Sequence, residues 1–321
     1  MVARYYAIVR AIYCGGQPAH GLPRLHPRAL DGVGKHLRAL IKGSLLHEIL
    51  SLPFFWAQSV GSNLPRARAE RLFYGPGRRQ YYLLAKPSAA AAKAPLLVYL
   101  HGGSWRWGKP EFFLAHAAVL NQLGYTVALP TYRPTPEANY AAIREDLAAM
   151  LRHLAGALKM GFESLPGTEL GGMSAGGHLA AMIALDPQLR AEAGLPAQAF
   201  RRFAVLGAPL DLELMPDNFI IRSLAGPRGE HAFREANPAF WAQKDSGQHL
   251  SGLLVHGTHD GMVPLASAMS FAKCWPKGAP LQIAREEKGT HLSAASWFFK
   301  TGAPRQALMK WWGTAAAGST G

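Results

Sequence analysis

The chain has 321 residues, of which 49% are hydrophobic and 17% are charged. This composition excludes an intrinsically disordered protein and is enough for one large domain, or one domain with an appendage. The formal net charge is +14, and residues 1–80 carry most of it as single basic residues among apolar ones. Because no nucleic-acid-binding motif accompanies them, we expect no nucleic-acid partner. A solvated basic face, or contact of this basic N-terminal part with an anionic membrane surface, accounts for the charge.

Cysteine content and apolar runs indicate the compartment. Cys14 and Cys274 have neither the spacing of a metal site nor enough partners for a disulfide framework, so we expect free thiols in a reducing environment. The apolar run at the N-terminus is interrupted by Arg10, which is unlike a secretory signal. No window supplies the roughly 18 uncharged apolar residues that a membrane span needs, and the nearest, Ile41 to Val60, contains Lys42, His47 and Glu48. The sequence therefore predicts a cytoplasmic protein.

Residues 1–66 form a first region with helical periodicity. Between Gly34 and Pro53, apolar residues recur at spacings of three and four, namely Leu37, Leu40, Ile41, Leu45 and Ile49. This pattern predicts an amphipathic helix whose apolar face packs on the core, with a lid over a pocket or a membrane-surface helix as alternatives. We interpret residues 1–66 as an N-terminal helical cap.

From residue 67 the apolar runs become short. After a predicted strand pair around Pro76-Gly77, strands are expected at 94–100, 125–130, 168–172, 202–208, 252–257 and 281–285. Helical stretches are expected at 112–123, 140–158, 175–185, 265–273 and 305–312. This alternation predicts an α/β fold with a mostly parallel central sheet flanked by helices, over residues 67–313. Residues 314–321 are expected to be a disordered tail.

The pentapeptide Gly172-Met173-Ser174-Ala175-Gly176 lies between a predicted strand and a predicted helix. A serine in such a turn must adopt a strained backbone to expose its hydroxyl, and the two flanking glycines let the strand and the helix approach closely. The helix N-terminus adds amide donors and the positive end of its dipole. We therefore predict that Ser174 is a nucleophile; a glycine-rich turn with an idle serine is the alternative.

A second glycine-rich turn, His101-Gly102-Gly103-Ser104-Trp105, follows the strand expected at 94–100. The developing oxyanion of an acyl-transfer reaction needs fixed hydrogen-bond donors. The backbone N–H groups of Gly102, Gly103 and Ala175 are the predicted oxyanion hole.

Several stretches together resemble the α/β-hydrolase superfamily, in its carboxylesterase and hormone-sensitive-lipase-like branch. They are YGPGRRQYYLLAKP, VYLHGGSWRWG, TYRPTPEANYAAIREDL, GMSAGGHLA and VHGTHDGMVP. The resemblance implies an α/β-hydrolase fold, with Asp260 as the acid and His291 as the base of a triad in the chain order serine, acid, histidine. Both residues occupy loops after predicted strands, as a triad requires.

Other acids and histidines are weaker candidates. Asp211 and Asp217 follow the strand expected at 202–208 and could substitute for Asp260. His256 and His259 precede the acid, against the chain order, and His178 lies inside the helix that Ser174 opens.

The chain departs from the lipase pattern at one position that bears on the substrate. Ser104 replaces the third glycine of the His-Gly-Gly-Gly motif, and the resulting HGGxW form also resembles arylformamidases and feruloyl-esterase-like proteins. Tyr132 and Arg133 are expected to buttress the oxyanion loop. Ser104, Trp105 and Trp107 are predicted to line the substrate pocket, and simple packing of the two tryptophans is the alternative.

The predicted function is that of a serine hydrolase, a carboxylesterase that cleaves small to medium carboxylic esters through an acyl-enzyme. Neither a metal nor an organic cofactor is expected. The alternatives are an arylformamidase-like amidase, a membrane-surface lipase, and a binding protein on the same scaffold without a working triad.

Overall fold

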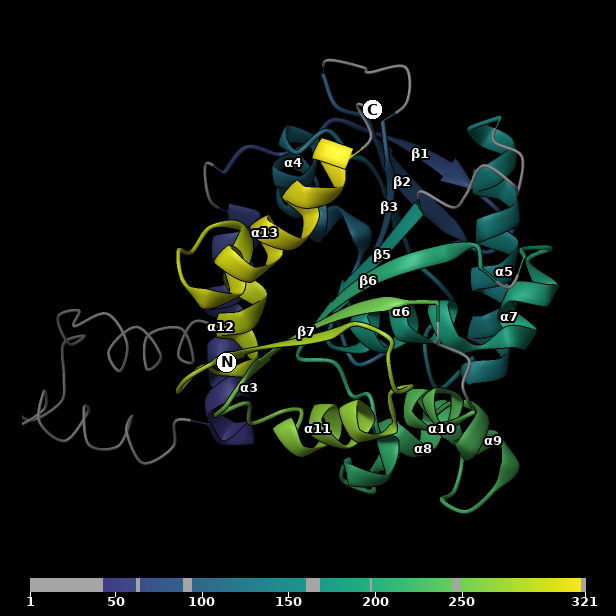
Figure 1. Ribbon diagram of the computed structural model, residues 1–321, viewed down its shortest axis with the longest axis vertical. Helices are drawn as coiled ribbons and strands as arrows, with labels where there is room; N and C mark the ends of the chain where they lie inside the picture. Colours follow the sequence, from purple (N-terminus) through teal and green to yellow (C-terminus); the bar gives the residue numbers. More distant parts are fainter. Residues whose placement is uncertain are drawn as a thin grey trace, which may run out of the picture.

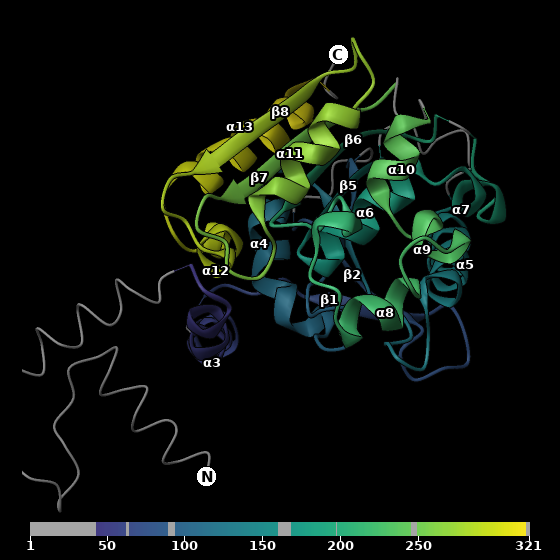
Figure 2. The same cartoon turned by 90° about the horizontal axis from the view of Figure 1, so that it is seen from below.

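The structure is a computed structural model that describes residues 43–61, 64–88, 94–159, 168–196, 198–244 and 249–318. Within them, one eight-stranded sheet has the order β1-β2-β4-β3-β5-β6-β7-β8, with β8 labelled in Figure 2 and most other strands in Figure 1. The pairs β1–β2 and β2–β4 are antiparallel, and all other neighbours are parallel. The predicted mostly parallel sheet is confirmed.

The strands fall close to the predicted apolar runs. They are β1 (Ala69–Phe73), β2 (Tyr81–Ala85), β3 (Leu96–Leu100), β4 (Thr126–Pro130), β5 (Thr168–Met173), β6 (Phe200–Leu206), β7 (Ser251–Gly257) and β8 (Leu281–Glu286). Every residue of β2, β3 and β5 is buried. Continuous apolar runs thus mark strands that are covered on both faces.

Helices cover both faces of the sheet (Figure 2). The longer ones are α3 (Leu45–Gly61), α4 (Leu114–Gln122), α5 (Tyr140–Ala157), α6 (Ala175–Leu185), α11 (Leu265–Cys274) and α13 (Ala303–Gly318). The shorter ones are α7 (Pro187–Glu192), α8 (Phe219–Ala225), α9 (His231–Glu235), α10 (Pro238–Gln243) and α12 (His291–Ala295).

Strand β3 shows how two hydrophobic cores arise on the two faces. Leu96, Val98 and Leu100 belong to the cluster that contains the inner sides of α5, α6 and α11. Leu97 and Tyr99 point the opposite way, into the cluster with α4 and α13. The alternation follows from the two-residue period of a strand. Because β3 to β8 are parallel, their carboxyl ends lie at one edge of the sheet.

The described part of the predicted cap is α3, and its orientation differs from the prediction. Leu45 and Ile49, expected on a core-facing side, are 54% and 46% exposed, whereas Glu48 is fully buried. The prediction of a buried apolar face was wrong for these two residues, because hydrogen bonds from distant backbone N–H groups bury the carboxylate instead. Residues 37, 40 and 41 of the pattern lie outside the described residues.

Several other regions differ from the sequence-based expectation. The segment between β6 and β7 contains α8, α9 and α10, and α7 and α12 are further short helices; no helical pattern was identified for any of these five. Helix α13 continues to Gly318, into the segment expected to be a tail. Among the helices of the described ranges, none is both long and apolar enough to cross a membrane.

Close contact between β5 and α6 makes one glycine position testable. A Cβ on Gly172 would lie 2.5 Å from the carbonyl oxygen of Gly176, so Gly172→Ala forces the strand and helix apart. We expect this substitution to lower the free energy of unfolding by about 2 kcal/mol in urea denaturation.

The matched control is Gly156→Ala near the end of α5, where a Cβ would meet no atom within 4 Å. Alanine there should raise stability by about 0.5–1 kcal/mol, because glycine loses more backbone entropy in a helix. Equal stability of the two variants would contradict the close approach of β5 and α6.

Candidate active site

Ser174 lies at the turn between β5 and α6, in a backbone conformation that side chains rarely adopt. Its φ is 53° and its ψ is −126°, and it is the residue that precedes the first turn of α6. Its backbone N–H donates to the carbonyl of Leu206 at the end of β6 (2.8 Å). Strain of this kind persists only where the surroundings enforce it, here the packed β5–α6 junction.

The predicted oxyanion loop packs directly against this turn. A Cβ on Gly176 would lie 2.2 Å from the carbonyl oxygen of Leu100 and 2.5 Å from that of His101. Ala175 is buried as the first residue of α6, and Gly102 and Gly103 follow β3. The three predicted donors therefore lie on two backbone segments that are in contact.

His101 fixes the orientation of this loop. Its Nδ1 lies 2.9 Å from the carbonyl oxygen of Gly102 and its Nε2 lies 3.1 Å from the hydroxyl of Thr131. Burial lowers the pKa of His101 to about 4. The ring is thus neutral, and since a carbonyl only accepts, Nδ1–H donates and Nε2 accepts from Thr131. Because C=O and N–H point in opposite directions in a trans peptide, this bond directs the N–H of Gly103 away from His101.

Tyr132 and Arg133, predicted as buttresses, have separate contacts. The ring of Tyr132 stacks on His101 at 5.1 Å between centroids, so it supports the loop. Arg133 instead binds the buried carboxylate of Asp146 on α5, through its Nε at 2.9 Å.

Trp105 lies in the hydrophobic core, and its indole N–H donates to Nδ1 of His178 (3.2 Å). Burial lowers the pKa of His178 to about 4, and its Nε2–H donates to the carbonyl of Ala236 (2.8 Å). His178 thus joins the oxyanion loop to the segment that precedes α10. Ser104 is partly exposed, and contact of Ser104 or Trp105 with substrate stays a prediction.

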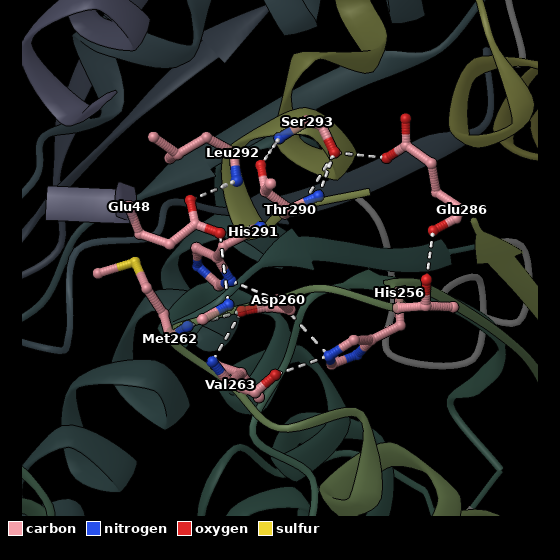
Figure 3. A network of polar contacts seen from close by, with 12 residues as sticks. Glu48, His256, Asp260, Met262, Val263, Glu286, Thr290, His291, Leu292 and Ser293 are labelled. Atoms are coloured by element: carbon pink, nitrogen blue, oxygen red, sulfur yellow. Dashed lines mark hydrogen bonds and ion pairs between the residues drawn. The ribbon is translucent and has the colours of Figure 1, made fainter. Parts of the chain in front are cut away.

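Asp260 and His291 lie together at the ends of β7 and β8 (Figure 3). The distance from Nδ1 of His291 to Oδ2 of Asp260 is 2.7 Å, and both side chains are almost completely buried. Oδ1 of Asp260 accepts from the backbone N–H groups of Met262 (2.9 Å) and Val263 (2.8 Å). The carboxylate is thereby held as an acceptor that fixes the tautomer of His291 with its proton on Nδ1.

Gly207 lies between the Asp260–His291 pair and the turn that contains Ser174. A Cβ at Gly207 would lie 3.0 Å from Nδ1 of His291 and 3.2 Å from Oδ2 of Asp260. The residue before it, Leu206, accepts the hydrogen bond from Ser174. The end of β6 therefore contacts the serine turn on one side and the Asp260–His291 pair on the other.

The weaker candidates have other partners. Asp211 accepts from the hydroxyl of Ser270 at 2.6 Å, and Asp217 forms an exposed ion pair with Arg222 at 2.6 Å. His259 is exposed, and its ring nitrogen lies 3.3 Å from the hydroxyl of Thr258. Neither acid is bonded to a histidine.

His256 is a second histidine at the carboxylate of Asp260. Its Nε2 lies 3.5 Å from Oδ2 and 2.9 Å from the carbonyl oxygen of Val263. Burial lowers its pKa, so the ring stays neutral and its Nε2–H donates to Val263. His256 therefore closes the turn that presents Asp260, a role that sequence reasoning missed.

The contact of Glu48 with this site was also not predicted from the sequence, because a glutamate on an amphipathic helix is usually exposed to solvent. Its carboxylate is fully buried and accepts from the backbone N–H of His291 at 2.6 Å (Figure 3). Longer contacts reach the N–H groups of Gly261 (3.4 Å) and Leu292 (3.5 Å). No local sequence signal marks a carboxylate whose partners lie more than 200 residues away.

Two opposing effects set the pKa of His291. Burial lowers it, but the adjacent Asp260 carboxylate, and more weakly Glu48, outweigh burial and raise it above its usual value. In the described ranges, the site included, no group of three or more His, Cys, Asp or Glu side chains is arranged to hold a metal ion.

Part of this chain matches a known family model, and the whole fold resembles solved structures of esterases. Residues 83–204, which include the oxyanion loop and the serine turn, match the family model BD-FAE. A structure of esterase B from Lactobacillus rhamnosis superposes with a TM-score of 0.68 at 18% identity, covering 89% of this chain and 97% of that one. Thermogutta terrifontis esterase 2 phosphorylated by paraoxon gives a TM-score of 0.60 at 19% identity, covering 78% and 94%.

The chain has an α/β-hydrolase fold. Among curated proteins, a kynurenine formamidase of Salmo salar is 29% identical over 40% of this chain and 43% of its own length. A probable isoprenylcysteine α-carbonyl methylesterase of Arabidopsis thaliana is 23% identical over 68% of this chain and 50% of its own length. The matches thus span about half the length of these relatives or less. The predicted α/β-hydrolase fold is confirmed, and the similarity to esterases agrees with the prediction of an ester hydrolase.

The Asp260–His291 contact predicts a defined pH dependence. A histidine base acts only when it is neutral, so activity should be lost as the pH falls through the pKa of His291, which Asp260 raises. Asp260→Asn removes the raising charge but leaves the burial that lowers the pKa. We expect kcat/KM to fall by roughly 10³-fold or more and its acid limb to move to lower pH, measured from about pH 4 to 9.

Asp217→Asn is the matched control, because Asp217 is an exposed aspartate paired with Arg222. Its pH profile should equal that of the wild type. An acid limb that stays in place in Asp260→Asn would contradict the assignment of the Asp260–His291 pair.

Proposed function

We propose that this chain is a serine hydrolase that cleaves small to medium carboxylic esters by a Ser174-His291-Asp260 triad. The observation that carries the proposal is the buried Asp260–His291 pair packed against Gly207, next to the residue that accepts a hydrogen bond from Ser174. A nucleophilic serine needs a base for its proton and hydrogen-bond donors for the oxyanion. In this proposal His291 is the base, and the donors are the backbone N–H groups of the loop after β3 and of the first turn of α6.

In the proposed reaction, His291 takes the proton of the Ser174 hydroxyl as the oxygen attacks the ester carbonyl. The N–H groups of Gly102, Gly103 and Ala175 stabilise the oxyanion, and Asp260 stabilises the imidazolium. His291 then protonates the alcohol that leaves. A water molecule, deprotonated by His291, attacks the acyl-enzyme and releases the acid.

The comparisons support ester cleavage at a coarser level. One similar structure carries the description of an esterase phosphorylated by paraoxon, an organophosphate, and another that of an esterase B. Organophosphates react with activated nucleophiles, which agrees with a nucleophilic serine. A small-molecule ester as the partner and a cytoplasmic location are part of this proposal.

The nucleophile is tested by Ser174→Ala with p-nitrophenyl acetate as substrate. Removal of the hydroxyl should reduce turnover by roughly 10³-fold or more, toward the uncatalysed rate, and abolish labelling by a fluorophosphonate probe. Ser88→Ala, at an exposed serine after β2, is the control and should keep wild-type turnover and labelling. Substantial turnover in Ser174→Ala would remove the proposed mechanism.

Cleavage of an aryl formamide is the second candidate, and one surface feature favours it. Trp107 and Phe219 are 57% and 61% exposed, and the guanidinium of Arg106 lies over both rings, at 5.5 Å and 5.8 Å. Trp107 is held against the predicted oxyanion loop, because its backbone N–H donates to the carbonyl of Gly103 (2.7 Å). An arginine between exposed aromatic rings suits a planar substrate that carries a carboxylate.

The two candidates are separated by Arg106→Gln assayed with N-formylkynurenine and with p-nitrophenyl acetate. If the formamide is the substrate, KM for this anionic aryl compound should rise by about 5- to 10-fold, because one charged contact is lost, whereas KM for the neutral ester should stay constant. Wild-type enzyme that cleaves only the ester, with no response to Arg106→Gln, would leave the esterase as the function.

A further inference from the structure

Glu48 is a buried carboxylate that the proposed reaction does not use, although it contacts both loops of the Asp260–His291 pair. Its partners within the described residues are backbone N–H groups: those of His291 and Leu292 after β8, and that of Gly261 after Asp260 (Figure 3). Burial of a carboxylate is costly, and these contacts offset part of that cost. The buried carboxylate of Glu48 is therefore held in place by the loops that carry His291 and Asp260.

The geometry places Glu48 where it can act on the backbone of both residues at once. The 2.6 Å bond restrains the peptide N–H of His291 itself, the residue whose ring must meet the serine hydroxyl. The contact to Gly261 restrains the residue that follows Asp260. Small displacements of a general base reduce catalysis strongly, so restraint of both loops has a direct effect on rate.

The charge of Glu48 matters in addition to its hydrogen bonds. During the reaction His291 becomes a cation, and a carboxylate bonded to its own backbone N–H stabilises that cation because both side chains are buried. The electrostatic influence of Glu48 raises the pKa of His291, in the same direction as Asp260.

We propose that Glu48 is a positioning residue of the hydrolase: it holds the His291 and Asp260 loops together and stabilises the protonated form of His291. This inference rests on the proposed function. It makes α3 part of the proposed catalytic unit.

Other ionisable groups near His291 must be kept in view in any pH experiment. Helix α12, which begins at His291, packs against α3 and β7, and residues of α12 are hydrogen-bonded to side chains of other elements. The ionisable groups on these elements and partners are His47 and Glu48 on α3, His256 on β7, Asp260 after β7, Glu286 on β8, and His116 on α4. Of these, Asp260 and Glu48 are the acids whose charges raise the pKa of His291.

Two variants separate charge from shape. Glu48→Gln keeps an oxygen acceptor for the His291 N–H but removes the charge, whereas Glu48→Asp keeps the charge and shortens the reach. For Glu48→Gln we expect kcat to fall by about 5- to 20-fold with KM almost unchanged. The acid limb of kcat/KM should move to lower pH by roughly half a unit to one unit, because a charge that raises the pKa of His291 is removed. For Glu48→Asp we expect a lower kcat with the acid limb in place.

Glu70→Gln is the matched control, because Glu70 is an exposed glutamate on β1, at the opposite edge of the sheet. It should match the wild type in kcat, KM and pH profile. All rates are expressed per active site, counted by fluorophosphonate labelling, so that unfolded protein does not lower the apparent kcat.

Different outcomes bear on the inference and on the proposed function. Wild-type activity that Ser174→Ala abolishes establishes the function whatever the Glu48 variants do. Given that result, a wild-type kcat and acid limb in Glu48→Gln would overturn the role of Glu48. If Glu48→Gln yields no folded protein, Glu48→Asp decides: a wild-type kcat in that variant overturns the inference.

Discussion

The arrangement at the site depends on keeping the Asp260 carboxylate charged although its side chain is buried. Its side chain has no exposed surface, and a carboxylate in that situation stays ionised only if donors surround it. Two backbone N–H groups bind one oxygen, and His291 binds the other. To deliver these donors, the chain must bring the ends of β7 and β8 together. A Cβ on Gly257 would lie 2.4 Å from the carbonyl oxygen of Gly289, so the two loops touch through their backbones.

Histidines serve two physical purposes around this site, and burial separates them. His101, His178 and His256 are buried and have lowered pKa values, so each ring remains neutral. One nitrogen of a neutral ring donates a hydrogen bond and the other can accept one. These three histidines fix the oxyanion loop, the segment before α10, and the turn of Asp260. His291 is also buried, but a carboxylate against its ring reverses the effect of burial on its pKa. The contact with Asp260, more than exposure, distinguishes the proposed base from the structural histidines.

Sequence reasoning succeeded where a feature is local. The strand-to-helix turn at Ser174, the glycine turn after β3 and the buried strands are encoded by neighbouring residues, so motif and periodicity predicted them. The pairing of Asp260 with His291 came from chain order and resemblance. What could not be predicted depends on distant partners: Glu48 is buried by N–H groups of Gly261 and His291, and Leu45 and Ile49 are exposed as a consequence. The short helices α8 to α10 were missed, because segments of five to seven residues show too few turns for a helical period.

The place of Glu48 in the chain has a consequence for how the site is completed. Glu48 and His291 are separated by 243 residues, and the N–H groups that bind the carboxylate exist in this arrangement only when β7 and β8 already lie side by side. Contacts this far apart in sequence carry a cost in loop-closure entropy, and this cost grows only slowly with the length of the loop. Without the docked α3, the carboxylate of Glu48 would be hydrated by solvent and the backbone N–H of His291 would lose this acceptor. The hydrogen bonds of Glu48 therefore link the docking of α3 to the arrangement of the proposed Asp260–His291 pair.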